Sequence, residues 1–349
     1  MKRYLILEDG TVFEGKAFGA DKTAVGELVF TTGMCGYIET LTDESYFGQI
    51  VLQTFPLIGN YGIIEEDFEG DCSVKAYAVQ EVCDNPSNFR MQKTLDAFLK
   101  EKGIPGICGI DTRAVTKKIR EKGVMNAALT DEVPDSLDFI KNYKIVKAVE
   151  SVTVKEPRVY NGNGKYSVVL IDYGAKRNII RELVKRDCRV TLVPASASAE
   201  EILSLKPDGI MLSNGPGDPA ENVYEINEIK KLAGNVPIFG ICLGHQLLAI
   251  SLGARTEKLK YGHRGVNQPV KETDGKRTYI TSQNHGYAVV SDSIKSGKIS
   301  FINANDGTCE GIDYPEINAF SVQFHPEACS GPRDTAFLFD RFIGLMEEK

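Results

Sequence analysis

Apolar and polar residues alternate in blocks through the second half of the chain. The run YSVVLIDYG at 166–174 predicts a strand, and KRNIIRELVKRD at 176–187 predicts the amphipathic helix that follows it. The alternation continues through CRVTLVPA, AEEILSLK, DGIMLS, ENVYEINEIKKLAG, VPIFGI and HQLLAISLG. Apolar strands separated by amphipathic helices indicate an α/β fold with a doubly wound, mostly parallel sheet that helices cover on both faces.

The first half of the chain predicts shorter strands and fewer helices. The run LILEDGTVFEG has Asp9 and Gly10 between two apolar segments, which is typical of a β-hairpin. The run IDTRAVTKKIREKG predicts a helix that begins after Asp111 and ends at Gly123. We therefore expect a mixed β/α domain in this half.

A polar stretch at 151–165 separates the two patterns. It contains Pro157 and a cluster of Asn and Gly residues, which are typical of a connection between domains. We expect an N-terminal domain at 1–150, a linker at 151–165 and an α/β domain at 166–349.

Composition and charge exclude several classes of protein. The 349 residues are 42% hydrophobic and carry a net charge of −7 without a cluster of basic residues, so we expect no nucleic-acid partner. No apolar run approaches the roughly 18–20 residues of a membrane span, and the apolar part of MKRYLILEDG is too short for a signal peptide. The eight cysteines form no C-x-x-C pair and are typical of free thiols. These features predict a cytoplasmic protein without a membrane partner.

Cys242 stands at a sharp break between a predicted strand and a predicted helix, with Gly240 and Gly244 beside it. The pattern G-I-C-L-G is the cysteine counterpart of the G-x-S-x-G elbow, in which small neighbours relieve crowding around a strained nucleophile. The helix N-terminus at this position favours the thiolate, and the carboxyl ends of parallel strands are where sites form. These five residues alone are equally compatible with a buried cysteine at a glycine-rich strand end.

His325 is the histidine best placed to serve such a nucleophile. Pro326 disfavours helical geometry at His325, so the segment stays extended and side chains two residues apart project to the same side. Glu327 can then orient the His325 imidazole and stabilise its charged form. Nucleophile, base and orienter would be Cys242, His325 and Glu327. Without the cysteine, the same pair would indicate only a solvated ion pair.

The remaining histidines predict no metal site. We expect His245 to be a packing or capping residue of the helix that follows the nucleophile, His263 to lie in a surface loop or hairpin, and His285 to lie at a turn. The spacing Cys242-x-x-His245 suits two metal ligands, but no second Cys/His pair at ligand spacing accompanies it. No G-x-x-x-x-G-K-[ST] motif occurs either, so no nucleotide site is predicted.

The segments GICLGHQ and FHPEA together resemble the class I (triad) glutamine amidotransferases. IDYGAKRNI, LSNGPGDP, QNHGYAV and the N-terminal segments GYIETLTDESYFGQIV and IDTRAVT are similar to the small-chain family of glutamine-hydrolysing carbamoyl-phosphate synthetases. The resemblance covers nearly the whole chain. It implies a flavodoxin-like amidotransferase domain after a swivelling β/β/α-type domain that docks a partner.

The resemblance also implies hydrolysis of L-glutamine to glutamate and ammonia. Cys242 would attack the side-chain amide, His325 would protonate the departing ammonia and then activate water against the thioester, and Glu327 would hold His325. The family pattern places glutamine and its oxyanion against Ser45, Gly215, Gly217, Leu243, Gln246, Asn284, Gly286 and Tyr287. The chain departs from the usual Ser-Pro-Gly-Pro after FHPEA, where it has Cys329-Ser330-Gly331-Pro332.

A partner is part of what the resemblance implies. ATP and Mg²⁺ are expected on a separate large subunit of the synthetase, which would receive the ammonia and make carbamoyl phosphate for arginine or pyrimidine synthesis; this chain itself needs no cofactor. Three alternatives are an amidotransferase subunit for anthranilate or guanylate synthesis, a non-catalytic scaffold, and a redox-sensing cysteine protein. The N-terminal 150 or so residues disfavour the first, and the complete triad disfavours the second.

Overall fold

The chain divides into two compact units, which are described separately here. The computed structural model describes residues 1–328 and 330–348. The units are Met1–Val146 and Lys147–Lys349, so the division falls close to the predicted end of the first domain at residue 150.

The stretch predicted as a linker differs from the expectation. Residues 151–165 contain the end of α5 (Ala148–Val152) and the strand β10 (Arg158–Tyr160), which pairs antiparallel with β12 (Cys188–Pro194). Valine and tyrosine favour extended backbone, and Tyr160 packs against the core of the second unit. The polar composition of this stretch therefore marks an edge strand of the second unit as well as a connection.

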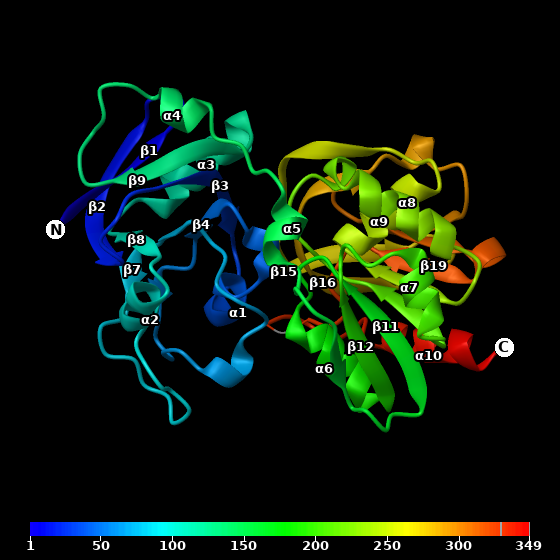
Figure 1. Ribbon diagram of the computed structural model, residues 1–349. Helices are drawn as coiled ribbons and strands as arrows, with labels where there is room; N and C mark the ends of the chain where they lie inside the picture. Colours follow the sequence, from blue (N-terminus) through cyan, green and yellow to red (C-terminus); the bar gives the residue numbers. More distant parts are fainter. Residues whose placement is uncertain (329, 349) are drawn as a thin grey trace. The chain divides into compact units, whose positions relative to one another are not determined.

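The first unit contains a closed barrel of seven strands, which can be followed in Figure 1. In order around the barrel, the strands are β1 (Lys2–Leu7), β2 (Val12–Gly19), β8 (Pro105–Cys108), β6 (Ala76–Ala78), β4 (Gln49–Gln53), β3 (Ala24–Thr31) and β9 (Met125–Thr130). Two short strands, β5 (Leu57–Ile58) and β7 (Glu81–Val82), pair outside it. The helices are α1 (Tyr37–Leu41), α2 (Leu95–Glu101), α3 (Thr112–Lys122) and α4 (Asp138–Lys141).

Two local predictions for this unit are confirmed. Strands β1 and β2 form the antiparallel hairpin, and Gly10 at its turn has a φ of 86°. Asp111 caps α3 because its carboxylate accepts a hydrogen bond of 2.9 Å from the Ala114 N–H, and Gly123 ends the helix at a φ of 100°. The closure of the strands into a barrel was not apparent from these local signals.

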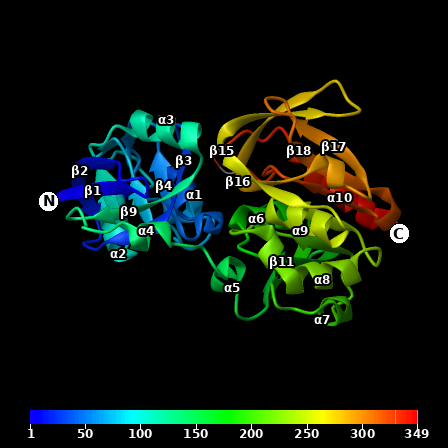
Figure 2. The same ribbon diagram turned by 90° about the horizontal axis from the view of Figure 1, so that it is seen from above.

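The second unit is built on one ten-stranded sheet in the order β10-β12-β11-β13-β14-β19-β18-β17-β15-β16. Strands β12, β11 (Tyr166–Asp172), β13 (Gly209–Leu212), β14 (Ile238–Ile241) and β19 (Ala319–Val322) are parallel, which confirms the α/β fold. Beyond β19 the sheet continues antiparallel through β18 (Cys309–Tyr314), β17 (Lys298–Asn303), β15 (Thr256–Glu272) and β16 (Thr278–Val289). Figure 2 shows these four strands on the side of the unit away from α7 and α8.

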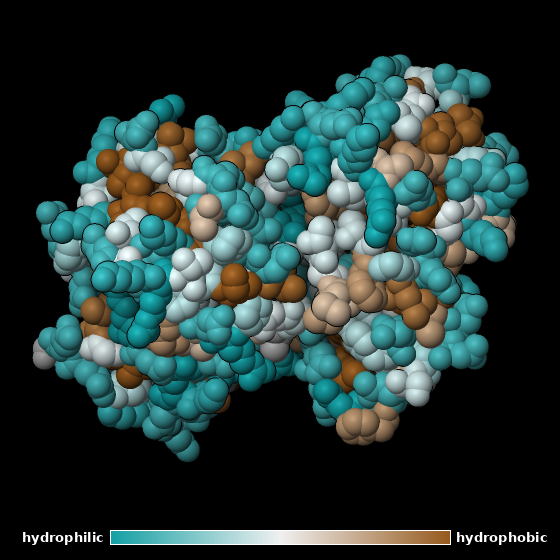
Figure 3. Space-filling view, turned by 180° about the vertical axis from the view of Figure 1, so that it is seen from behind, coloured by the Kyte–Doolittle hydropathy of each residue, from teal (hydrophilic) through white to brown (hydrophobic). Residues whose placement is uncertain are grey.

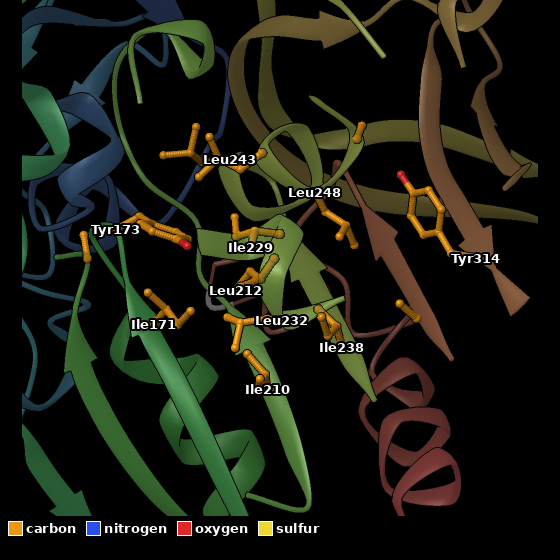
Figure 4. Close-up of a cluster of buried hydrophobic side chains, with 14 of the residues drawn as sticks. Ile171, Tyr173, Ile210, Leu212, Ile229, Leu232, Ile238, Leu243, Leu248 and Tyr314 are labelled. Carbon is orange, nitrogen blue, oxygen red and sulfur yellow. The ribbon is translucent and has the colours of Figure 1, made fainter. Parts of the chain in front are cut away.

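Helices cover both faces of the parallel strands. One core forms against α7 (Ala199–Ser204), α8 (Val223–Leu232) and α9 (Leu243–Ser251), and the other against α6 (Arg177–Lys185) and α10 (Phe337–Glu347). In the first core, shown in Figure 4, Ile171 and Leu212 of the strands pack with Ile229 and Leu243 of the helices. Alternate strand residues enter opposite cores because successive side chains in a strand point to opposite faces. This packing fixes the strand ends, which carry the candidate site.

One face of the molecule is seen in the space-filling view of Figure 3, and it is mainly polar. Hydrophilic residues cover most of the face seen in Figure 3, and hydrophobic residues form small separate groups there. Among the described residues, none of the helices combines the length and the apolar character that crossing a membrane requires.

Candidate active site

Cys242 occupies a strained turn between β14 and α9. Its φ of 52° and ψ of −103° are unusual for a residue with a side chain, and its N–H donates a 2.9 Å hydrogen bond to the Val322 carbonyl of β19. Such backbone strain costs on the order of 1–3 kcal/mol and persists only where the surrounding structure enforces it. Here the parallel pairing of β14 with β19 enforces it, so the predicted elbow is present at the carboxyl end of β14.

The two glycines of the elbow are required by close backbone packing. A Cβ on Gly244 would lie 2.4 Å from the Leu212 carbonyl oxygen, and a Cβ on Gly240 would lie 2.8 Å from the Gly244 carbonyl oxygen. Gly244 also donates a 3.0 Å backbone hydrogen bond to Ser213. The G-x-C-x-G spacing therefore presses the start of α9 against the end of β13 and leaves no space for side chains there.

His325 and Glu327 lie together in the interior of the second unit. His325 Nδ1 and Glu327 Oε1 are 2.6 Å apart, and both side chains are fully buried. The His325 N–H donates to the Ser282 carbonyl at 2.9 Å, which keeps the segment extended as Pro326 predicts. The expected alignment of the two side chains is thus observed.

The other ring nitrogen of His325 stays available for the nucleophile. His325 Nε2 is buried and has no conventional hydrogen-bond partner among the described residues, while the Cys242 thiol is close enough to influence the ionisation of the ring. A loose contact between nucleophile and base is common before substrate binds. The three predicted residues are therefore brought to one place, although 85 residues of chain separate Cys242 from Glu327.

Burial and charge compete for the proton of His325. Burial and the Lys176 ammonium both lower the pKa of His325, but the Glu327 carboxylate and the Cys242 thiol outweigh them and raise it to about 9. Burial raises the pKa of Glu327, but the charges of His325 and Lys176 dominate and hold it below its ordinary value. The pair is thus an imidazolium and a carboxylate at neutral pH.

Lys176 and Asn178 belong to this site and were not singled out from the sequence. Lys176 Nζ lies 3.3 Å from His325 Nδ1 and 3.6 Å from Glu327 Oε1, and the Asn178 side chain donates to the Glu327 backbone carbonyl. Lys176 is the residue before α6 and Asn178 lies in its first turn, shortly after the end of β11. The available signal in the sequence was a lysine and an asparagine shortly after the apolar run at 166–172, at the carboxyl end of a predicted parallel strand.

The predicted oxyanion residues lie against the elbow. A Cβ on Gly215 would lie 2.2 Å from the Tyr173 carbonyl oxygen and 2.8 Å from Leu243 Cδ2, so the backbone there approaches α9 closely. Gly217 has a φ of 92°, which favours glycine. The Leu243 N–H belongs to the first turn of α9, where amides lack acceptors within the helix. This arrangement can present backbone N–H groups to the oxygen of a carbonyl group that lies next to Cys242 Sγ.

Most of the predicted glutamine contacts also lie around the thiol. Cys242 Sγ is 3.7 Å from the Asn284 carbonyl oxygen, and Gln246 Nε2 donates a 2.8 Å hydrogen bond to the Tyr287 carbonyl oxygen. Gly286 lies between Asn284 and Tyr287 on β16. The second unit therefore gathers Gln246, Asn284, Gly286 and Tyr287 beside the nucleophile.

Two predicted features stay untested by this geometry. Ser45 belongs to the first unit, where it is buried in a single 3₁₀ turn (Glu44–Tyr46) and its N–H donates to Asp43 Oδ1 at 2.9 Å, so its contact with glutamine stays a prediction. Cys329, the first residue of the departure from the family sequence, lies outside the described residues. Ser330 adopts a φ of 75°, a conformation that side chains rarely take.

The remaining histidines differ in part from the expectation. His245 is fully buried in α9, as predicted, and Nδ1 lies 2.8 Å from Ser321 Oγ. His263 and His285 are facing residues of the antiparallel pair β15 and β16, so His263 lies in a hairpin, one of the two expected positions, whereas His285 lies in a strand and not at a turn. The polar neighbours of His263 suggested a surface position, but the antiparallel extension of the sheet covers most of this ring.

The fold and the site define a class I glutamine amidotransferase domain. Residues 169–345 match the family described as "Glutamine amidotransferase class-I", and residues 5–129 match "Carbamoyl-phosphate synthase small chain, CPSase domain". A glutamine amidotransferase of Thermotoga maritima with a solved structure is similar at 20% identity and a TM-score of 0.39, covering 52% of this chain and 84% of its own.

Proteins named carbamoyl phosphate synthase small chain are similar over nearly the whole length. That of Oceanobacillus iheyensis is 52% identical over 99% of this chain and 96% of its own. Those of Staphylococcus epidermidis and Listeria monocytogenes are each 50% identical, covering 99% and 100% of this chain and 96% and 98% of their own. The chain belongs to the carbamoyl-phosphate synthase small chain family, and it is an enzyme subunit of the glutamine amidotransferase class.

Proposed function

We propose that this chain hydrolyses L-glutamine with Cys242, His325 and Glu327 and passes the ammonia to a large, ATP-dependent carbamoyl-phosphate synthetase subunit. The observation that carries the proposal is the strained cysteine of the elbow next to a buried imidazole whose other nitrogen lies 2.6 Å from a carboxylate. Family membership supports the glutamine substrate and the large partner.

The first half of the reaction forms a thioester. The Cys242 thiolate attacks the side-chain carbonyl carbon of glutamine, and the amide oxygen becomes an oxyanion. The Leu243 and Gly215 N–H groups stabilise this oxyanion; removing one such donor typically costs ~10²–10³ in rate. The His325 imidazolium then gives its Nε2 proton to the amide nitrogen, the C–N bond breaks, and ammonia leaves.

The second half releases glutamate. The neutral His325 takes a proton from a water molecule as that water attacks the thioester carbonyl. The C–S bond breaks, glutamate forms, and the thiolate and imidazolium are restored. Glu327 keeps Nδ1 protonated throughout and compensates the positive charge on the ring.

The amino-acid end of glutamine is held by the segment 284–287 and by Gln246 in this proposal, with Ser45 contributed by the first unit. The first unit docks the large subunit. Ammonia needs an enclosed route to the partner because free ammonia is largely protonated at neutral pH and then has no lone pair. ATP and Mg²⁺ act on the large subunit, and this chain uses no cofactor for glutamine hydrolysis.

We place the reaction in the cytoplasm, as a step toward arginine or pyrimidine synthesis. The seven described cysteines are free thiols, which suits a reducing compartment. The carbamoyl phosphate made with the partner would serve either route.

The Cys242→Ser variant tests the proposal in the complex with the large subunit. We expect glutamine-dependent carbamoyl phosphate synthesis to fall at least ~10³-fold, because a serine hydroxyl is not activated by an imidazolium, while ammonia-dependent synthesis stays within twofold of wild type. Loss of both activities would indicate a scaffold role. Retention of glutamine-dependent synthesis would remove Cys242 from the mechanism.

A further inference from the structure

Two histidines and a glutamate outside the triad form a compact cluster in the antiparallel part of the sheet. His263 of β15 and His285 of β16 are cross-strand neighbours with ring centroids 4.9 Å apart, and Glu310 of β18 lies beside them. Each residue offers one ligand atom, and these atoms all lie within 4.8 Å of one another. Glu310 is fully buried, His285 is 5% exposed, and the His263 side chain is 11% exposed.

The outer nitrogen of each ring is already engaged. His285 Nδ1 lies 2.7 Å from the Tyr287 carbonyl oxygen, which can only accept, so this nitrogen carries a proton. His263 Nε2 lies 2.8 Å from Asp306 Oδ2, which likewise accepts. When the rings are neutral, their lone pairs are therefore on His263 Nδ1 and His285 Nε2. Imidazoles that ligate metals are oriented in this way, with the far N–H on a carboxylate or a carbonyl.

The inner side of the cluster holds more acceptors than donors. His285 Nε2 lies 3.1 Å from Gln283 Oε1, and Gln283 Nε2 donates to Glu310 Oε2 at 3.0 Å. With the proton of His285 on Nδ1, its Nε2 and the Gln283 Oε1 are both acceptors and cannot form a hydrogen bond with each other. Turning the Gln283 amide over, which exchanges its nitrogen and oxygen, gives His285 a donor but sets the amide oxygen against the Glu310 carboxylate. In either orientation, one proton or one cation is missing from this group.

We propose that His263 Nδ1, His285 Nε2 and a Glu310 carboxylate oxygen bind one divalent transition-metal ion of the zinc class. Two imidazoles and one carboxylate are a common ligand set for zinc. Gln283 Oε1 is placed to be a fourth ligand, and the partial exposure of His263 gives access from solvent. Asn303 Nδ2 donates to Glu310 Oε1 at 3.1 Å and orients that carboxylate.

Charges of both signs surround the cluster. Glu310 and Asp306 are carboxylates on two sides of His263, at 3.5 Å from Nδ1 and 2.8 Å from Nε2. Arg264 and the His325 imidazolium are the neighbouring cations and oppose the ion, because both contribute to lowering the pKa of His285 after the larger effect of burial. The ion would therefore depend on its direct ligands, and the surrounding charge balances.

The ion would stabilise the segment that is proposed to hold glutamine. His285 lies between Asn284 and Gly286, and the Tyr287 carbonyl accepts from both His285 Nδ1 and Gln246 Nε2. This consequence rests on the proposed function, whereas metal binding itself does not. The competing explanation is a proton on Glu310, since burial raises the pKa of this carboxyl.

The test measures zinc on the full-length chain after chelator treatment and dialysis. Equilibrium dialysis against Zn²⁺ should give one tightly bound equivalent per chain, and a thermal melt should shift upward with Zn²⁺. Co²⁺ should give the visible bands of a tetrahedral N/O site without a thiolate charge-transfer band, which excludes binding by the cysteines. We expect Glu310→Gln and His263→Gln each to weaken Zn²⁺ binding ~100-fold or more, and Asp306→Asn roughly 10–100-fold.

Glu316→Gln is the matched control, because Glu316 is exposed and lies outside the cluster. It should bind Zn²⁺ as wild type does. The proposal is overturned if wild type binds no stoichiometric Zn²⁺, if the ion sits on thiolates, or if Glu310→Gln binds as tightly as wild type. In those cases a proton on Glu310 neutralises the cluster. Since none of these readouts uses glutamine, they are independent of the proposed activity.

Discussion

Gln246 Nε2 donates a 2.8 Å hydrogen bond to the carbonyl oxygen of Tyr287. This bond ties the helix that follows the nucleophile to the strand that carries Asn284 and Gly286. The same amide nitrogen lies 2.9 Å from Gln323 Oε1, two residues before His325. One side chain therefore connects the three segments on which the proposed site depends.

Replacing Gln246 is expected to weaken glutamine binding more than turnover. In the proposed function, Gln246 holds the charged amino-acid end of glutamine. A hydrogen bond to a charged group contributes about 1.5–3 kcal/mol, so Gln246→Ala should raise KM for glutamine roughly 10–100-fold with a smaller change in kcat. Steady-state glutaminase kinetics of the complex measure this split. Ammonia-dependent synthesis is the control and should not change. A fall in kcat at unchanged KM would place Gln246 in the chemistry instead.

The raised pKa of His325 predicts an alkaline limit of activity. The thiolate–imidazolium pair is lost when His325 loses its proton, so kcat/KM for glutamine should fall above about pH 9. Glu327→Gln removes an interaction that raises this pKa and should move the alkaline limb to lower pH. Lys176→Met removes one that lowers it and should move the limb to higher pH. Shifts in the same direction for both variants would contradict this electrostatic account.

The same proton links stability to pH. The folded-state pKa of His325, about 9, lies above the ordinary value of 6.5, so the contribution is complete below pH 6.5 and is lost as pH rises through about 9. A difference of this size corresponds to at most roughly 3 kcal/mol. The free energy of unfolding of wild type, relative to His325→Asn, should decline over this range in urea titrations. Taking the difference cancels the other titrating groups, and parallel curves would refute the prediction.

Gly244 of the elbow and Gly344 of α10 predict opposite effects for the same substitution to alanine. Gly244→Ala puts a Cβ 2.4 Å from the Leu212 carbonyl oxygen and should destabilise the fold by at least about 1–3 kcal/mol. Gly344→Ala, in α10 with nothing within 4 Å of its Cβ, should stabilise by about 0.5–1 kcal/mol. Chemical denaturation measures both. Equal changes in the free energy of unfolding for the two variants would mean that the close contact of Gly244 with the Leu212 carbonyl does not restrict the side chain at position 244.

The sequence predicts the site best where its geometry is local. The five residues around Cys242 are compatible with the elbow, although they leave a buried cysteine open, and the alignment of His325 with Glu327 follows from a proline and a two-residue spacing. Each feature is set within a single strand end, so a pattern of residue types is enough to indicate it. The parallel strands are predicted for the same reason, since each strand–helix pair carries its own apolar periodicity.

Features that require distant strands to pair were not predicted. Lys176 reaches His325 only because β11 and β19 end at the same edge of one sheet. The cluster of His263, His285 and Glu310 takes its members from three strands of the antiparallel extension, and no spacing along the chain encodes that proximity. Burial of polar side chains in such places depends on register and cannot be inferred from composition.

The most direct test is to find where the acyl group is during turnover. Acid quenching of the complex within milliseconds of adding glutamine, followed by peptide mass spectrometry, should find one glutamyl group on the peptide that contains Cys242. Hydroxylamine should discharge it, as expected of a thioester. A glutamyl group on any other residue, or undiminished glutamine hydrolysis by Cys242→Ala, would contradict the account.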